Sequence, residues 1–406
     1  MRTTAIRGVF VLVVAWLAWR VPGADLTASY VAGRLVAEGH AASLYTANFA
    51  TVSWNQDPNW VQAVAGTDLD PATVTAYLYT PLWAWIVAPL ASTLSFAAFK
   101  HLFTVLSLAA MAAMTGIGAR TWAPRLETPQ WQAGLLLGLG CSAPFIWSVS
   151  LGQIHPIFLW LAVLAGALSL RGREATAGAL LAAAAAVKIT PGWLALTWVF
   201  AGCRRATLSF VVTSAALAAA TVAVLGWPVF AAYIAAVRHV GHRMTLSFNN
   251  DSLPTLLLGR YLNTATAFRW QPVALPVGIA IFCVAATALL AAGAGIADRR
   301  ATMTSRRTGA IVTLLAATIL APLAWNHYFV LLVLPVMVLL AAWRERRGVV
   351  WLVIALGLVA LNVPPLAYGV GAPLWVVALR SQCIAAIVAI TALIALRFWP
   401  APMPRT

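Results

Sequence analysis

Uninterrupted apolar runs recur along the whole chain and are separated by short segments that carry arginine. Runs of roughly 14 to 25 such residues cross a hydrocarbon core of about 30 Å as helices, because a helix satisfies its own backbone hydrogen bonds. They do not alternate as the strands of a membrane barrel would. The residues are 62% hydrophobic and 9% charged, against about a quarter charged in soluble domains. We therefore predict an all-α polytopic membrane protein.

The apolar runs predict about twelve transmembrane helices in a single domain, 1–406. The two shortest, 175–188 and 190–203, are expected to form a hairpin with Pro191 at its tip. The expected spans are 8–22, 96–118, 131–147, 154–170, 175–188, 190–203, 207–224, 273–297, 308–324, 328–343, 349–363 and 375–397.

The arginine clusters predict the topology. If the N-terminus is cytoplasmic, every compact cluster, such as "DRRATMTSRR" (298–307), falls on the cytoplasmic side, together with the C-terminus. This requires that the apolar stretch 81–92 lies in the interface or re-enters instead of crossing. The first segment has the charge pattern of a signal peptide. We expect an uncleaved span, because Pro22 is unsuited to a cleavage site after Ala24.

Two long outer segments remain, 23–95 and 225–272. The first is predicted to hold interfacial or re-entrant helices, including an amphipathic helix over 25–39 that Asp25 caps and Gly39 ends. The second holds the polar stretch "FNNDSLP", 248–254, which by itself indicates a loop.

Other classes of site are not indicated. The formal charge of +16 comes from clusters between apolar runs, so it indicates membrane topology and not nucleic-acid binding. The four cysteines lack metal-ligand spacing, so neither a metal site nor a disulfide framework is expected. No phosphate-binding loop of the GxxxxGK type occurs, and we expect no cofactor.

Asp25 is one of only ten acidic residues, and it follows the first predicted span closely. One interpretation is a helix cap, worth about 1 kcal/mol. The other is a general base at the membrane face, where partial burial raises the pKa of a carboxylate. The two roles are compatible, since a capping position also fixes the side chain.

Further polar residues are expected on the same outer side. Of the 26 basic residues only Lys100 and Lys188 are lysines, and Lys188 could hold a phosphate as a point charge or reach the interface. His327, in "LAPLAWNHYFVLL", is either a packing residue or a site residue. Gln153 and His155, in "LGQIHP", could bind sugar or phosphate, or could complete a turn. A base, cations and aromatic rings together favour transfer from a lipid-linked phosphate donor, because the phosphate leaves as a stable anion.

Six segments, in order, resemble the GT-C membrane glycosyltransferases, specifically glycosyltransferase family 87. They are "ADLTASYVAGRLVAEGHAASLY" (24–45), "YLYTPLWAWIVAPL" (77–90), "PFIWSVSLGQIHPIFLWLAVLAGAL" (144–168), "AGALLAAAAAVKITPGWLAL" (177–196), "FNNDSL" (248–253) and "LAPLAWNHYFVLLVLP" (320–335).

The resemblance implies a GT-C-like fold and an inverting enzyme of the bacterial inner membrane with an outward-facing site. It implies a polyprenyl-phosphate sugar donor, a glycolipid or glycan acceptor, and surrounding membrane lipid. Mannose is the first expectation for the sugar and arabinofuranose the second. Asp25 matches the catalytic base. The other implied site residues are Lys188, His327 and Gln153 for the donor, and Tyr79, Asn249, Asn250, Tyr30 and Trp325 for the cavity or acceptor.

Two alternatives stay open. A polytopic lipid or glycan transporter would also place a few charges in apolar spans, although transporters commonly show internal repeats and none is evident here. A family member that scaffolds an envelope complex without catalysing transfer would share the same sequence features.

Overall fold

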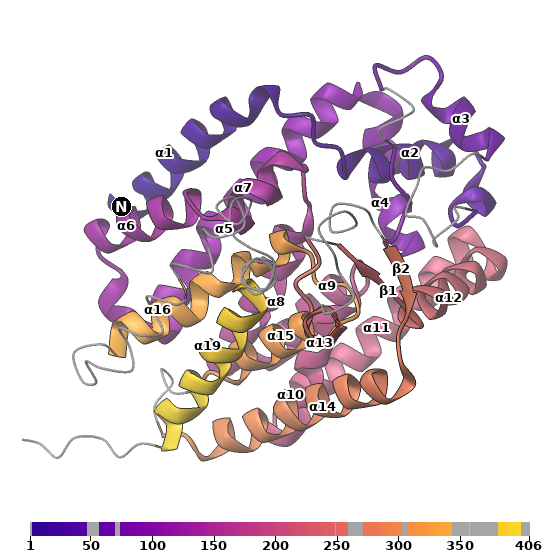
Figure 1. Cartoon of the computed structure of the whole chain (residues 1–406). Coiled ribbons are helices and arrows are strands. Elements are labelled where there is room, and N and C mark those ends of the chain that lie inside the picture. The colour runs from indigo at the N-terminus through magenta and orange to yellow at the C-terminus, as the bar shows by residue number, and fades with distance from the viewer. Residues whose placement is uncertain are drawn as a thin grey trace, which may run out of the picture.

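The computed structural model describes residues 2–46, 57–69, 74–247, 249–258, 271–302, 307–342, 357 and 381–398, and these are predominantly helical (Figure 1). The longer helices are α1 (Arg2–Leu17), α2 (Leu26–Ala37), α4 (Pro81–Thr93), α5 (Phe96–Trp122), α6 (Pro129–Gly140), α7 (Ala143–Ser150), α8 (His155–Leu170), α9 (Glu174–Ala185), α10 (Leu194–Ala201), α11 (Arg204–Leu225), α12 (Trp227–Gly241), α14 (Val277–Arg300), α15 (Gly309–Ile319), α16 (Val333–Ala342) and α19 (Ser381–Phe398).

Shorter elements connect these helices. They are the helices α3 (Pro58–Val64) and α13 (Leu253–Leu258), the 3-10 helices η1 (Ala18–Arg20), η2 (Ala41–Ser43), η4 (Pro124–Leu126), η5 (Thr190–Trp193) and η8 (Asn326–Leu332), and the strands β1 (Arg243–Leu246) and β2 (Gln271–Ala274). The two strands pair antiparallel, with Arg243 opposite Ala274.

The helices agree with a membrane protein. Within the described residues, four helical stretches are long and apolar enough to cross a bilayer: Arg2–Arg20, Phe96–Trp122, Arg204–Leu225 and Val277–Arg300. The pair α6 and α7, bent by 65°, is a candidate fifth. The figure of about twelve spans stays a prediction, and most of the expected span 349–363 lies outside the described residues.

Several of these helices present apolar side chains outward. The exposed fraction is 72% for Leu12 and 76% for Trp16 on α1, and 72% for Leu289 on α14. Such faces are costly in water but favourable against acyl chains. The fold therefore packs one side of these helices against the protein, only partly buried in the case of α1, and offers the other side to lipid.

Helices α1 and α5 run antiparallel, and a side-chain contact lies at each end of the pair. At one end, Nη2 of Arg7 lies 3.1 Å from Oε2 of Glu127. At the other end, Nζ of Lys100 donates to the carbonyl of Val21 at 2.8 Å. Lys100 thus binds a backbone carbonyl just beyond the 3-10 turn that ends the first span, four residues before Asp25.

Helix α2 packs against α4, and the two lie with α3 at one end of the molecule, next to α12 (Figure 1). The close approach depends on Gly33, where a Cβ would lie 2.8 Å from the Cβ of Ala91. Helix α4 has 13 residues, or about 20 Å, which is shorter than a hydrocarbon core. Its interfacial or re-entrant placement stays a prediction.

The expected hairpin around Pro191 has a different packing from the one that its sequence suggests. Pro191 does lie at the turn, in η5. However, α9 packs mainly on α8 and α11, while α10 packs mainly on α14. Glycines allow these helix pairs to pack closely. A Cβ at Gly178 on α9 would lie 2.3 Å from the carbonyl oxygen of Ala206 on α11, and one at Gly295 on α14 would lie 2.3 Å from that of Thr197 on α10.

Candidate active site

Two glycine turns bring Asp25 to its place. Gly23 and Gly152 have φ values of +68° and +67°. This is a backbone conformation that residues other than glycine rarely adopt. They also touch, since a Cβ at Gly152 would lie 2.9 Å from the Cα of Gly23. The backbone N–H of Asp25 donates to the carbonyl of Leu151 at 3.0 Å. The start of α2 is thereby joined to the loop that precedes α8.

This contact places Gln153 against Asp25. The side-chain amide of Gln153 donates from Nε2 to Oδ2 of Asp25, and the hydroxyl of Ser107 donates to the backbone carbonyl of Gln153 at 2.7 Å. Asp25 occupies the predicted N-cap position of α2, but its side chain makes no capping hydrogen bond. The carboxylate is therefore oriented toward Gln153 and not toward its own helix.

Burial raises the pKa of the Asp25 carboxyl from 3.8 to about 6, while the hydrogen bond from Gln153 and the charge of Lys188 act in the opposite direction. The residue as a whole nevertheless keeps some exposure. A carboxylate that is ionised near neutral pH, poorly solvated and reachable is suited to accept a proton.

Lys188 lies just beyond the end of α9, near enough to Asp25 for the two charges to interact. The hydroxyl of Thr80 donates to the carbonyl of Ala186, so the loop that carries Tyr79 is joined to the end of α9. Nζ of Lys188 lies 3.6 Å from the ring centroid of Tyr328 and 6.0 Å from that of Tyr79, and it donates to the hydroxyl of Tyr328. The ammonium is therefore held between two aromatic rings.

Two buried histidines lie under this lysine. The ring of His155 packs on that of Tyr328, with centroids 4.2 Å apart, and His327 meets the same ring edge-on at 4.7 Å. Both imidazoles are 4% exposed. In the described structure, the two ring nitrogens of His155 have no hydrogen-bond partner, and Nε2 of His327 also has none. Because an unpaired buried nitrogen costs about 1–3 kcal/mol, these atoms are candidates to bind a substrate group.

Asn250 acts as a clamp that holds the segment before His327. Its Nδ2 donates to the carbonyls of Thr245 and Pro322 at 2.9 and 3.1 Å, and its Oδ1 accepts from the N–H of Ala324 at 2.9 Å. It is fully buried, and in these contacts its side-chain amide bonds to backbone groups of the protein. Asn250 therefore positions the loop, and its role in lining the cavity stays a prediction.

Asn249 and Trp325, two further predicted residues, lie where the segment of Asn250 meets the segment before His327. The carbonyl of Asn249 accepts from the N–H of Asn326 at 3.0 Å, and Asn250 forms an isolated β-bridge with Trp325. Asn249 and Trp325 are both partly exposed. They lie at the margin of the cluster, beside the segment that carries His327 and Tyr328.

The two predicted tyrosines have different surroundings. Tyr79 belongs to the cluster, is partly exposed, and burial together with the charge of Asp25 raises its pKa above the usual value. Tyr30 is 2% exposed, donates to the carbonyl of Leu94 at 2.9 Å and packs against Phe96 and Phe99. Tyr30 thus lies in the core between α2, α4 and α5, apart from the cluster.

We call Asp25, Gln153, His155, Lys188, His327, Tyr79 and Tyr328 the polar cluster. Its partly exposed members are Asp25, Tyr79, Lys188 and Tyr328, and the others form a buried floor. It combines one carboxyl group, one amino group and hydrogen-bonding groups on several aromatic rings. Among the described residues no three His, Cys, Asp or Glu side chains gather in a way that could hold a metal ion.

Two features of the candidate site were not predicted from the sequence. They are Tyr328 and the contact between Gly23 and Gly152. Tyr328 follows His327 directly, so its neighbourhood was the available signal. The contact of Gly23 with Gly152 joins residues far apart in the chain, and neither glycine lies in a motif that predicts such a contact.

A sequence model described as glycosyltransferase family 87 matches residues 77–324, more than half of the chain. The matched region includes Tyr79, Gln153 and Lys188, whereas Asp25 and His327 lie outside it. No curated protein sequence matches the chain.

Proposed function

The chain belongs to glycosyltransferase family 87 and is thus a membrane glycosyltransferase. From that premise we propose that it transfers a sugar from a polyprenyl-phosphate donor to a glycolipid or glycan acceptor. We further propose that the reaction occurs at the polar cluster, on the outer face of a bacterial inner membrane, with both termini cytoplasmic. Mannose is the first candidate sugar and arabinofuranose the alternative.

The pairing of Asp25 with Lys188 carries this proposal. The two charges interact, although they come from segments before α2 and after α9. One is suited to remove a proton and the other to hold an anion. Transfer from a sugar phosphate requires both functions at one place.

The reaction follows as a single displacement. Asp25 accepts the proton of an acceptor hydroxyl, and the hydroxyl oxygen forms a bond to the anomeric carbon of the donor. The bond between that carbon and the phosphate oxygen breaks, and its electron pair leaves with polyprenyl phosphate. Lys188 stabilises the negative charge that accumulates on the phosphate. Attack opposite to the leaving group inverts the anomeric configuration.

Gln153 and Tyr328 support the two charged groups. Gln153 keeps the Asp25 carboxylate oriented and lowers its pKa. Tyr328 restrains Lys188, which has several rotatable bonds. Restraint of this kind reduces the entropy lost on reaching the reactive geometry. His155 and His327 are positioned to donate or accept hydrogen bonds from sugar or phosphate oxygens.

A donor panel tests the proposal. The purified full-length protein in lipid nanodiscs is offered polyprenyl-phosphate mannose, polyprenyl-phosphate arabinofuranose or the matching nucleotide sugars, together with a glycolipid acceptor mixture. We expect extended product with one polyprenyl-phosphate sugar and none with a nucleotide sugar. Transfer from nucleotide sugars alone would contradict the proposed donor.

A further inference from the structure

Three buried polar side chains meet at the start of the segment that carries His327. They are Asp251, Asn326 and Gln382, whose exposed fractions are 0%, 2% and 0%. Asp251 lies in the loop before α13, Asn326 is the first residue of η8, and Gln382 lies in the first turn of α19. The proposed reaction uses none of the three, although a carboxylate is costly to bury away from water.

The carboxylate of Asp251 joins the two amides. Its Oδ2 accepts from Nδ2 of Asn326 at 3.2 Å and from Nε2 of Gln382 at 3.1 Å. The amides are oriented with nitrogen toward the carboxylate, because an amide oxygen in that place would face another acceptor. Nε2 of Gln382 also donates to the backbone carbonyl of Asn326 at 3.1 Å. Gln382 therefore contacts Asn326 both directly and through Asp251.

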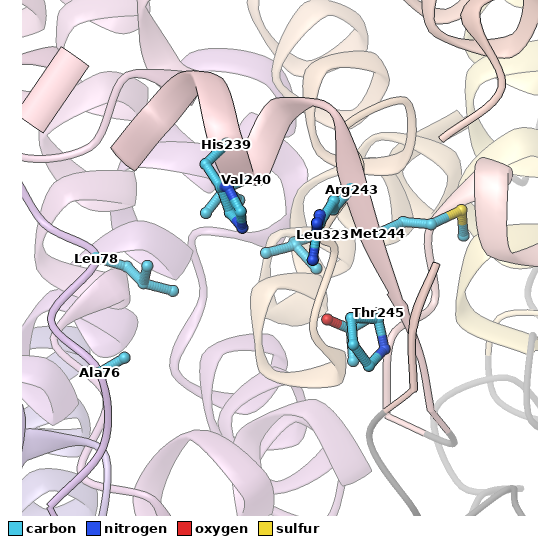
Figure 2. Close-up of a pocket in the computed structure, with 9 residues that line it drawn as sticks. Ala76, Leu78, His239, Val240, Arg243, Met244, Thr245 and Leu323 are labelled. Atoms are coloured by element: carbon cyan, nitrogen blue, oxygen red, sulfur yellow. The ribbon is translucent and has the colours of Figure 1, made fainter. Parts of the chain in front are cut away.

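Backbone contacts near β1 hold the same segment. The N–H of Asp251 donates to the carbonyl of Ala324 at 2.7 Å. Leu323, the residue before Ala324, lines a small pocket together with Thr245 of β1, as Figure 2 shows. The loop that follows β1 thus fixes the chain shortly before His327.

A second restraint comes from α19, a helix that is distant in the sequence. Helix α19 packs on α15, α16 and η8 (Figure 1). Helix η8 begins after Trp325, whose side chain does not cap it. The hydrogen bonds from Gln382 to Asp251 and to Asn326 therefore restrain the first residue of η8, directly before His327.

Packing alone does not account for these polar residues. Apolar side chains would fill the same volume without the cost of burying a carboxylate, and replacement of buried ionic groups by apolar ones is often neutral or stabilising. A hydrogen-bonded network instead fixes the relative positions of the segments that it joins. Here it joins the loop after β1, the start of η8 and the start of α19.

We propose that Asp251 and Gln382 are positioning residues, which hold the start of η8 so that the imidazole of His327 meets the donor. This rests on the transferase function proposed above, in which His327 binds sugar or phosphate oxygens. Neither positioning residue touches the substrate. Both act through Asn326, and because Asn326 is bonded to His327, a small shift there displaces the imidazole from its productive position.

A double-mutant cycle tests the proposal. Gln382→Met keeps the length of the side chain and removes the donor. In the purified full-length protein, with polyprenyl-phosphate mannose or arabinofuranose as the donor panel selects, kcat/KM should fall about tenfold, the size that one hydrogen bond to a charged group supplies. In a His327→Phe background the same change should cost less than about twofold, because the group that Gln382 positions is already gone.

Gln132→Met is the matched control. Gln132 is equally buried, accepts from Arg7 at 2.7 Å and donates to the carbonyl of Leu126 at 3.0 Å, outside the polar cluster. Its loss should lower the unfolding temperature but change kcat/KM per folded enzyme by less than about twofold in either background. A tenfold loss from Gln382→Met in both backgrounds, or an equal loss from Gln132→Met, would contradict the proposal.

Hydrogen exchange gives a second measurement that does not require turnover. The backbone N–H groups of Asn326 and Tyr328 are hydrogen-bonded at the start of η8, so their exchange reports on this segment. Gln382→Met should speed their exchange about tenfold, and Gln132→Met should leave it unchanged. Unchanged exchange in Gln382→Met would overturn the proposal.

The two measurements separate this inference from the proposed function. If the unaltered protein transfers sugar from neither donor, the proposed function fails, while hydrogen exchange still decides whether Gln382 holds the segment. Exchange also decides the question if His327→Phe has no measurable rate. Asp251→Asn, which keeps the shape of the side chain and one acceptor, replaces Gln382→Met if that variant does not fold, and the same results then support or overturn the proposal.

Discussion

Gln153 donates a side-chain hydrogen bond to the carboxylate of Asp25, a residue 128 positions earlier in the chain. The bond joins the loop before α8 to the start of α2, and it lowers the pKa of a carboxyl that burial raises. The balance between the two effects, a pKa of about 6, leaves the Asp25 carboxyl ionised at neutral pH and able to accept a proton.

Replacement of Gln153 by leucine should move the pH dependence of transfer. The base acts as a carboxylate, so kcat/KM falls as the pH drops through its pKa. Without the hydrogen bond, that pKa lies above 6, and the acidic limb moves to higher pH. A pH profile of kcat/KM measures this. A profile that keeps its limb but falls uniformly would show that Gln153 acts only on geometry.

Lys188→Met should lower kcat/KM about 10- to 100-fold, because a hydrogen bond to a charged group contributes about 1.5–3 kcal/mol. Tyr328→Phe should cost about tenfold or less, since it removes only the restraint on Lys188 and leaves the ring in place. Steady-state kinetics with the donor varied give both numbers. A larger loss in Tyr328→Phe than in Lys188→Met would contradict these roles.

His155→Phe should separate stability from activity. The phenyl ring can keep the contact with Tyr328 and removes two buried nitrogens that lack partners in the described structure, so the protein should be more stable by about 1 kcal/mol. If those nitrogens bind substrate, kcat/KM should fall about tenfold. Thermal unfolding and initial rates measure the two effects.

A second histidine offers the control for that variant. His101 stacks on Trp19, with centroids 3.5 Å apart, at the junction of α1 and α5 and outside the polar cluster. His101→Phe should leave the rate within about twofold. Unchanged activity in His155→Phe would show that His155 serves packing alone.

Gly152→Ala should destabilise the protein more than Gly172→Ala does. Both glycines have positive φ, +67° and +75°, so each alanine carries a similar backbone cost of about 1–2 kcal/mol. Only at Gly152 does the new Cβ meet another backbone, at 2.9 Å, whereas nothing lies within 4 Å of it at Gly172. The difference between their unfolding temperatures measures the contact with Gly23. Equal shifts would contradict its importance.

The helical membrane class could be predicted from the sequence because it depends on local composition. Long apolar runs specify helices wherever they occur, and α5, α11 and α14 follow their predicted ranges closely. The break between α6 and α7 was not predicted, since the run 131–147 is mostly apolar in spite of Ser142 and Pro144. There Ser142 caps a new helix by accepting from the N–H of Phe145, and the span bends.

The polar cluster could be predicted in part, for a similar reason. Asp25 and Lys188 are conspicuous because charges in or beside apolar runs are costly. Asn250 and Tyr30 are as polar in the sequence as the cluster residues, but their hydrogen bonds go to backbone carbonyls in the core. Which polar side chain faces a ligand and which one satisfies the backbone depends on contacts between distant segments, and single motifs do not encode them.

The rate of transfer by Asp25→Asn tests the account most directly. Asparagine keeps the shape of the side chain and cannot accept the proton, so kcat should fall about 10²- to 10⁴-fold. Its folding should not suffer. The folded pKa of Asp25 lies above 3.8, so the contribution of Asp25 to stability is full below that pH and is lost as the pH rises through about 6. At neutral pH the variant should therefore be at least as stable as the unaltered protein.

Asp68→Asn serves as the control and should retain its rate within about twofold. It is a matched change elsewhere in the segment between α1 and α5, where the carboxylate accepts from the N–H of Phe96. The measurement is the initial rate of sugar transfer from the accepted polyprenyl-phosphate donor by both variants. We expect almost no transfer by Asp25→Asn and near-normal transfer by Asp68→Asn. A normal rate in a folded Asp25→Asn variant would contradict the assignment of Asp25 as the base.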